Sequence, residues 1–127
     1  MAVELNHTIV HARQRDESAT FLADILGLAS PGQFGPFRTV EVANGVSLDF
    51  AGSDRPVTPQ HYAFLVSESE FDQIFGRILE RGLDYWADPG RSRPKQLNHR
   101  DGGRGAYFLD PDGHVLEILT RPYGSGG

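Results

Sequence analysis

Residues 107–118 read YFLDPDGHVLEI, and this stretch decides the fold. Two apolar runs flank the sequence DPDG at 110–113, whose residue types favour a tight turn. We therefore expect two strands, at residues 104–109 and 114–121, joined by that turn. Glu117 stands four residues after the turn glycine, and its side chain points to the face opposite that of its two apolar neighbours.

The same arrangement occurs earlier in the chain. Strands are expected at residues 36–43 and 46–51, joined across Asn44-Gly45, a dipeptide that accepts the positive φ angles of a tight hairpin. When this segment is shifted by 68 positions, NGVSLD falls on DGHVLE, and Asp49 takes the place of Glu117. The chain therefore contains an internal repeat.

Each half also begins with a strand that carries a histidine. The first strand, VELNHTIVH, spans residues 3–11, and the second, HYAFLVS, spans residues 61–67. A shift of 54 positions places His7 on His61 and also aligns the helices that follow.

Both helices show end signals. In the first, RDESATFLADILGL, Asp16 or Ser18 is expected to cap the first turn and Gly27 to end the helix. In the second, SESEFDQIFGRILERGL, Ser67 and Glu70 form a capping-box pattern. Each half thus reads as a strand, a helix and then further strands.

The composition of the chain argues against several classes of partner and site. The chain has 127 residues, which suffices for one domain, and its net charge of −5 makes nucleic acid an unfavourable partner. The sequence contains no cysteine, which excludes disulfides and thiolate metal sites, and no apolar run approaches membrane-spanning length. We expect a cytoplasmic protein with no membrane partner.

The repeat predicts a metal site. If the halves pack with approximate two-fold symmetry, His7, His61, Asp49 and Glu117 lie around one axis and can converge on a single point. Two imidazoles and two carboxylates suit divalent Fe, Mn, Ni or Zn. The alternative for each residue alone is a solvated side chain on a strand.

The first-strand histidine, the HYAFLVS strand and the closing segment YFLDPDGHVLEI resemble the vicinal oxygen chelate superfamily, which includes glyoxalase I, extradiol dioxygenases, fosfomycin-resistance enzymes and bleomycin-binding proteins. The resemblance implies an α+β fold of two βαβββ modules whose curved mixed sheet surrounds a metal. The modules would span residues 1–55 and 56–121, within a single domain of residues 1–127, and a disordered tail would span 122–127. The implied ligands are His7, His61 and Glu117, with Fe(II) favoured and Ni, Mn or Zn as alternatives.

The resemblance also implies roles around the metal. Asp49 stands where glyoxalase I has a fourth ligand and where extradiol dioxygenases place a proton-handling histidine, so either role is open. Tyr107 and His99 match the positions at which extradiol enzymes contact substrate oxygens. The expected catalytic residues are therefore Asp49, Tyr107 and His99.

Three positions depart from particular branches of the superfamily. The resemblance to glutathione-dependent glyoxalases would place Arg and Asn where this sequence has His11 and Ser53. Fosfomycin-resistance enzymes usually carry Thr where this sequence has Ile9. Both activities are disfavoured, and extradiol-type dioxygenation of a small substrate with vicinal oxygens is weakly favoured.

Two alternatives stay open: a glyoxalase-like isomerase or lyase that does not use glutathione adducts, and a metal-free antibiotic-binding protein. The resemblance further implies a homodimer, in which one site can draw residues from two subunits. The segment 89–103 is expected to be a mobile loop, and its basic part, residues 91–104, is either a lid for an anionic substrate or a solvated loop. His114 is expected to be exposed.

Overall fold

The computed structural model describes residues 2–126 and divides the chain into two compact units, unit 1 (Met1–Thr58) and unit 2 (Pro59–Gly127). Met1, which the predicted first module includes, and Gly127, which the predicted tail includes, lie outside the described residues. No helix in the described chain is both long enough and apolar enough to span a bilayer.

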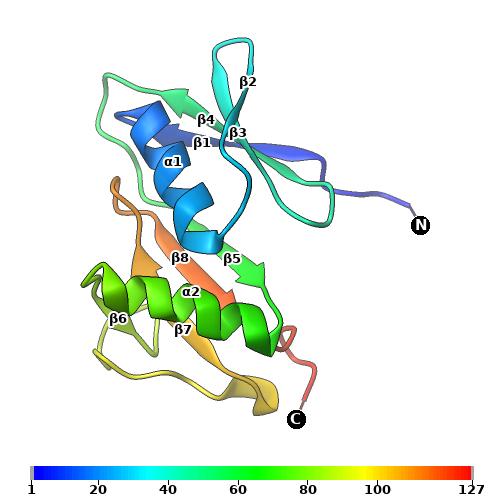
Figure 1. Ribbon diagram of the computed structural model, residues 1–127, viewed down its shortest axis with the longest axis vertical. Helices are drawn as coiled ribbons and strands as arrows, with labels where there is room; N and C mark the ends of the chain where they lie inside the picture. Colours follow the sequence, from blue (N-terminus) through cyan, green and yellow to red (C-terminus); the bar gives the residue numbers. More distant parts are fainter. Residues whose placement is uncertain (1, 127) are drawn as a thin grey trace. The chain divides into compact units, whose positions relative to one another are not determined.

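Unit 1 is a four-stranded mixed sheet with one helix (Figure 1). The strand order is β1-β4-β3-β2, in which β1 runs parallel to β4 and the other neighbours are antiparallel. The elements are β1 (His7–Ala12), α1 (Arg15–Leu26), β2 (Gly32–Phe34), β3 (Phe37–Glu41) and β4 (Ser47–Gly52).

Unit 2 repeats this topology. Its strand order is β5-β8-β7-β6, and again only the first pair, β5 and β8, is parallel. The two units are therefore two βαβββ modules, and the predicted α+β architecture is confirmed. The elements are β5 (His61–Leu65), α2 (Glu68–Glu80), β6 (Tyr85–Trp86), the 3₁₀ turn η1 (Arg100–Gly102), β7 (Gly105–Leu109) and β8 (Val115–Leu119).

The register of the strands follows the sequence repeat. His7 is paired with Ser47 in unit 1, and His61 is paired with Val115 in unit 2. Shifting the first strand by 54 positions and the last by 68 superposes these two pairs, as the sequence comparison requires.

The two helices differ at their N-termini. The predicted capping box of α2 is confirmed: the Ser67 hydroxyl accepts from the Glu70 N–H at 3.1 Å, and the Glu70 carboxylate accepts from the Ser67 N–H at 2.8 Å. The predicted cap of α1 is wrong, because this helix begins one residue after Gln14, whose side chain makes no capping bond, and Asp16 lies inside its first turn. Gly27 ends α1 in the left-handed conformation, at φ 72°, as predicted.

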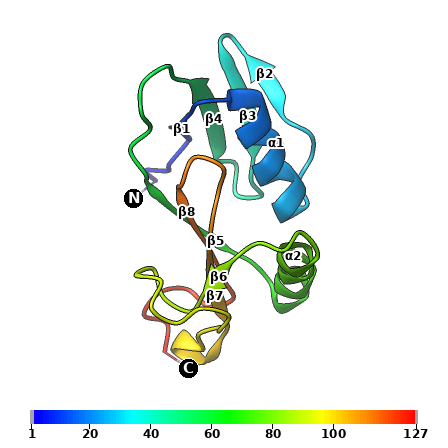
Figure 2. The ribbon, with the colours of Figure 1, turned by 90° about the vertical axis from the view of Figure 1, so that its left-hand side faces the viewer.

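In each unit the helix covers one face of the sheet (Figures 1 and 2). Alternate strand residues on that face join the helix to form the core. The buried residues of this kind are Val10, Ala12, Leu48, Phe50, Leu22 and Ile25 in unit 1, and Ala106, Phe108, Leu116, Ile118, Phe71, Ile74 and Ile78 in unit 2. The opposite face carries the odd-numbered residues of the same strands, which include most of the candidate site residues.

The segment 89–103 is tied to the sheet rather than open. Asp88 accepts hydrogen bonds from the backbone N–H groups of Ser92 and Arg93 at 3.0 and 2.8 Å. Farther along, Asn98 and Gly105 exchange two backbone hydrogen bonds at 3.0 and 2.9 Å. The segment is therefore fastened at both ends, by the Asp88 carboxylate at one end and by backbone pairing with Gly105 at the other.

The C-terminal residues also make defined contacts. The Asp101 carboxylate accepts from the N–H groups of Gly124 and Gly126 at 3.1 and 2.9 Å. Asp101 adopts φ 54°, a left-handed conformation that Asp tolerates better than most residues. The described part of the tail is therefore hydrogen-bonded to η1.

Candidate metal centre

Three candidate residues of unit 2 lie on neighbouring strands, on the sheet face that α2 leaves open. In the register of the sheet, Tyr107 on β7 is paired with Glu117 on β8, and Glu117 is paired with Ala63 on β5. His61 lies two residues before Ala63, so it shares that face with Glu117. The strand pairing alone therefore brings an imidazole, a carboxylate and a phenol together.

The closest approach is between His61 and Glu117, where Nε2 lies 3.0 Å from Oε1. The other ring nitrogen, Nδ1, lies 3.1 Å from the backbone carbonyl oxygen of Val115. Since a carbonyl can only accept, Nδ1 is the nitrogen that carries a proton, and Nε2 is the nitrogen that faces the carboxylate. Only a proton or a cation shared by the two atoms stabilises that arrangement.

The pair fits a divalent metal ion. Two donors bound to one ion at about 2.0–2.1 Å and at right angles lie about 3 Å apart, which is the observed separation. A histidine whose Nδ1–H is held by a backbone carbonyl is also the usual form of a metal-binding imidazole. Glu117 is only 4% exposed, and a buried carboxylate needs a cation or hydrogen-bond donors.

Tyr107 extends the cluster on one side. Its ring stacks on His61 with a centroid distance of 5.8 Å and an interplanar angle of 26°. Its hydroxyl accepts a hydrogen bond from Nη1 of Arg100 at 2.6 Å. Burial raises the pKa of Tyr107 and the charge of Glu117 adds to the rise, while the Arg100 hydrogen bond acts in the opposite direction. The phenol is therefore held in its neutral, proton-donating form at neutral pH.

Unit 1 places His7 and Asp49 at the equivalent positions. Asp49, which is 8% exposed, is paired in register with Ile9, just as Glu117 is paired with Ala63. One of its carboxylate oxygens accepts from the Ser47 hydroxyl at 2.7 Å. This bond satisfies one oxygen and orients the other.

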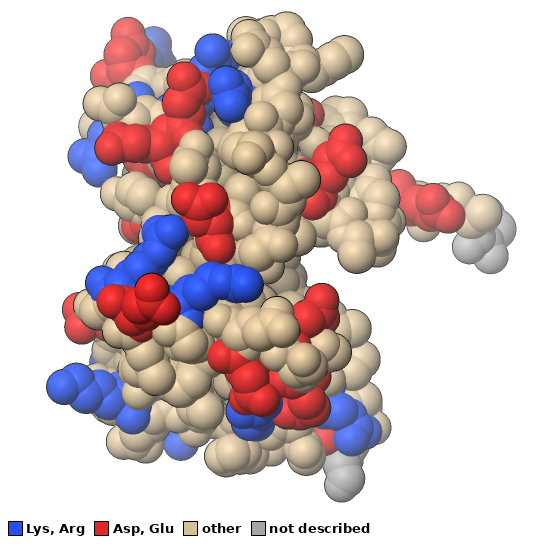
Figure 3. Space-filling view, in the orientation of Figure 1, with Lys and Arg blue, Asp and Glu red and all other residues tan. Residues whose placement is uncertain are grey.

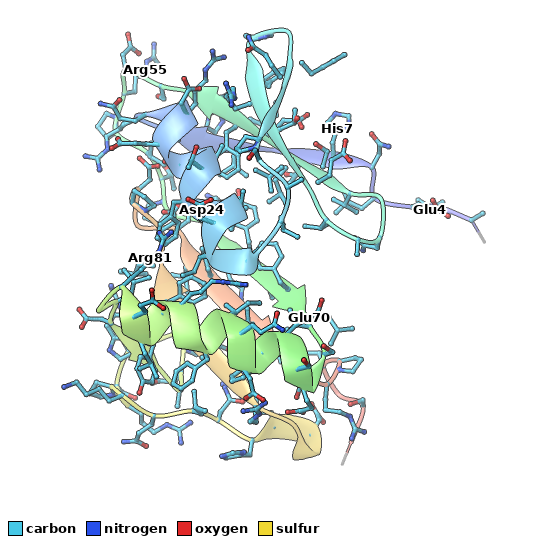
Figure 4. The ribbon with its side chains drawn as sticks, viewed as in Figure 1. Glu4, His7, Asp24, Arg55, Glu70 and Arg81 are labelled. Atoms are coloured by element: carbon cyan, nitrogen blue, oxygen red, sulfur yellow. The ribbon has the colours of Figure 1, made fainter. Side chains whose placement is uncertain are left out.

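His7 is exposed near the end of β1 (Figure 4). Its Nδ1 lies 2.7 Å from the side-chain oxygen of Asn6, which leaves Nε2 as the nitrogen available to a metal. The same nitrogen is thus available in His7 and in His61. Within the described part of either unit, no group of three or more His, Cys, Asp or Glu side chains is arranged as a metal site, so neither unit supplies a complete ligand set.

The structure does not bring His99 to the cluster. Its side chain is exposed, and the described residues of unit 2 show no hydrogen bond or ring contact between it and Tyr107 or Glu117. The residue that contacts Tyr107 is the next one, Arg100, which belongs to the basic segment 91–104. The many basic residues of this segment indicated that it could contribute to a site, but the sequence could not show which arginine does so.

The expectation that His114 is exposed is wrong. This residue is 1% exposed, and its Nδ1 accepts from the backbone N–H of Gln60 at 2.9 Å. Its ring also meets Tyr62 edge-on at 5.6 Å. The sequence position after a turn glycine suggested solvent, but the turn directs this side chain to the residue that precedes His61.

Comparisons with known proteins agree with the topology. Among solved structures, "Oxidase ChaP-H1" is 73% identical with a TM-score of 0.96 and covers 97% of this chain and 99% of its own. "Oxidase ChaP-H2" is 68% identical with a TM-score of 0.97 over the full length of both chains. Among curated proteins, the glutathione transferase FosA of Serratia marcescens is 31% identical over 124 residues, 93% of this chain and 81% of its own.

A further curated relative is the metallothiol transferase FosB of Lysinibacillus sphaericus, which is 29% identical over 91% of this chain and 81% of its own. The family model of the Glyoxalase/Bleomycin resistance protein/Dioxygenase superfamily matches residues 4–118. The chain therefore belongs to the glyoxalase, bleomycin resistance protein and dioxygenase superfamily, the vicinal oxygen chelate proteins.

Proposed function

We propose that this protein is a divalent-metal-dependent oxidoreductase that binds two adjacent oxygens of a small substrate. The observation that carries the proposal is the paired approach of His61 and Glu117, with the tautomer of His61 set by the Val115 carbonyl. The two solved structures with 73% and 68% identity are both described as oxidases, which favours oxidation over isomerisation.

In this proposal His61 and Glu117 supply two ligands and His7 supplies the third. The third ligand comes from the same chain or from a second copy in a homodimer. Two imidazoles and one carboxylate with open positions are the ligand set of non-haem Fe(II) oxygenases, so Fe(II) is the favoured ion, ahead of Ni, Mn and Zn. When bound, such an ion activates dioxygen and acts as a Lewis acid toward the substrate oxygens.

The remaining site residues handle protons. Tyr107 donates its phenol proton to a substrate oxygen, because burial keeps it protonated beside Glu117. Asp49 accepts a proton or anchors a water, since the Ser47 hydroxyl already occupies one of its oxygens. His99, the other residue expected to handle protons, is exposed beside η1 and contacts neither Tyr107 nor Glu117 among the described residues, so the proposal assigns it no direct step.

The favoured reaction is extradiol-type cleavage of a vicinal diol by dioxygen. The transferase activities named for the Fos relatives are less favoured, because Ile9 stands where fosfomycin-resistance enzymes usually carry threonine. A glyoxalase-like isomerisation without glutathione adducts is the second enzymatic candidate. Asp49, buried at the position equivalent to Glu117, favours it if its other oxygen reaches the ion.

The test compares two histidines of one strand. Protein loaded with Fe(II) without oxygen is mixed with a panel of catechols, and oxygen uptake and bound metal are measured for wild type, His7→Ala and His11→Ala. The ligand proposal expects wild type and His11→Ala to retain one Fe(II) per site and to consume oxygen, whereas His7→Ala loses both.

The outcomes separate the candidates. Metal retention without oxygen uptake across the panel contradicts the dioxygenase and favours the isomerase. Absence of metal retention, with no gain in thermal stability on adding Fe(II), Ni(II), Mn(II) or Zn(II), contradicts both enzymes and favours the metal-free binding protein.

A further inference from the structure

Arg100 forms no ion pair within 4.0 Å with an Asp or Glu of the described residues. Arg104, four residues farther along the chain, forms ion pairs with Glu68 and Asp72, each at 2.8 Å. Figure 3 shows acidic and basic side chains next to each other on the visible face of unit 2. By contrast, no described Asp or Glu oxygen lies within 4.0 Å of the Arg100 guanidinium, whose close contact is the neutral Tyr107.

The backbone that carries Arg100 is anchored. The Arg100 N–H donates to the side-chain oxygen of Asn98 at 3.3 Å, and the Asn98 amide donates in turn to the Ala87 carbonyl at 2.9 Å. Asn98 is 7% exposed and lies against Gly105, where an added Cβ would come within 2.8 Å of its amide. These bonds hold the backbone of Arg100, the first residue of η1, against Gly105 at the start of β7.

The guanidinium is also oriented. Nη1 donates to the Tyr107 hydroxyl at 2.6 Å, and Cζ lies 5.6 Å from the centre of the same ring. That ring stacks on His61, whose Nε2 meets Glu117. One of the five N–H donors of the guanidinium thus holds its orientation through Tyr107. The other four donors can bind a planar anion with two oxygens, such as a carboxylate.

We propose that Arg100 is a specificity residue that binds an anionic oxygen pair of the ligand, a carboxylate, beside Tyr107. The proposal deepens the proposed function, because it names the charge of the substrate, and it rests on that function for the meaning of the site. The guanidinium is held by a single side-chain hydrogen bond to the Tyr107 hydroxyl, so its other N–H donors are available to the ligand. The basic segment 91–104 then acts through one anchored residue rather than as a lid.

The experiment uses metal-free protein, so that it does not depend on metal binding. Benzoate and its neutral analogue benzamide are titrated into ¹⁵N-labelled full-length protein, and the shifts of the arginine Nε–H signals and the backbone amides are followed. The variants are Arg100→Met, Arg100→Lys and the matched control Arg91→Met. Arg91 lies in the same basic segment and also faces an aromatic ring, Trp86, at 5.9 Å, but has no hydroxyl contact there.

We expect benzoate, and not benzamide, to shift the Arg100 Nε–H signal and the amides around Tyr107 in the wild type. Arg100→Met should weaken benzoate at least tenfold, Arg100→Lys should recover part of the loss, and Arg91→Met should match the wild type. A wild type without an Arg100 response, or equal losses in Arg91→Met and Arg100→Met, overturns the proposal. If Arg100→Met fails to fold, the wild-type Arg100 signal and the lysine variant decide.

The proposed function fails separately. A benzoate response that depends on Arg100, in a protein that retains no divalent metal, leaves the anion site in place and removes the metal-dependent chemistry.

Discussion

The two units share one topology but differ in the side chains on the sheet face that the helix does not cover. In unit 2, the residues at the matched register positions are Tyr107, Glu117 and His61, which contact one another. In unit 1 the equivalent positions hold Thr39, Asp49 and His7, and Asp49 bonds to Ser47 instead. The two units therefore place residues at equivalent positions, but most of the side chains that contact one another at the candidate site belong to unit 2.

The largest expected difference between the units is tested by replacing their equivalent acids, Glu117 and Asp49, with the corresponding amides. Glu117→Gln should lower affinity for Mn(II), measured by titration calorimetry, by more than about 100-fold, since the loss of a ligand exceeds the 10–100-fold typical of a supporting residue. Asp49→Asn should lower it by only about 10–100-fold if Asp49 supports the site without binding the ion.

Both substitutions are isosteric, so circular dichroism should show the same fold for both variants. Equal losses of affinity would mean that Asp49 is a fourth ligand, and the two units would then contribute equally to the site.

A second prediction concerns the anchoring of η1, which unit 1 lacks. Gly105→Ala should destabilise the protein by about 1–3 kcal/mol, because the new methyl group would overlap the Asn98 amide in a packed position. The measurement is urea unfolding at equilibrium. The control is Gly76→Ala on the exposed side of α2, where an added Cβ meets nothing within 4 Å and helix propensity favours alanine by about 0.5–1 kcal/mol.

If Gly105→Ala proved as stable as Gly76→Ala, Asn98 would be free to move aside, and the fixed placement of Arg100 would lose its support.

The smallest expected change in stability concerns the N-termini of α1 and α2. Ser67→Ala should cost about 1 kcal/mol in urea unfolding, because it removes the hydroxyl that accepts from the Glu70 N–H. Gln14→Ala should cost no more than a few tenths of a kcal/mol, because the Gln14 side chain makes no capping bond. A similar cost at both positions would mean that the difference in capping does not distinguish the helices.

The sequence was sufficient for the repeat, the strand registers that follow from it and the capping box of α2. These features depend on residue types at fixed spacing, such as Ser67 three residues before Glu70, which determine structure locally. The short strands β2 and β6 were not identified as separate strands, since two or three residues carry too little periodicity.

The sequence could not identify the contact between Arg100 and Tyr107 or the burial of His114. Both depend on contacts across the sheet: the first with Tyr107, and the second with the backbone of Gln60. A count of charges shows that the segment is basic, but only the hydrogen bond between the Arg100 guanidinium and the Tyr107 hydroxyl distinguishes this arginine from the others.

The hydrogen bond from His61 to the Val115 carbonyl has a consequence for variation among related chains. The partner is main chain, so its position depends on the pairing of β5 with β8 and not on which amino acid stands at position 115. The imidazole therefore keeps its orientation while the surrounding side chains change, so related chains can vary those side chains without loss of the donor atom.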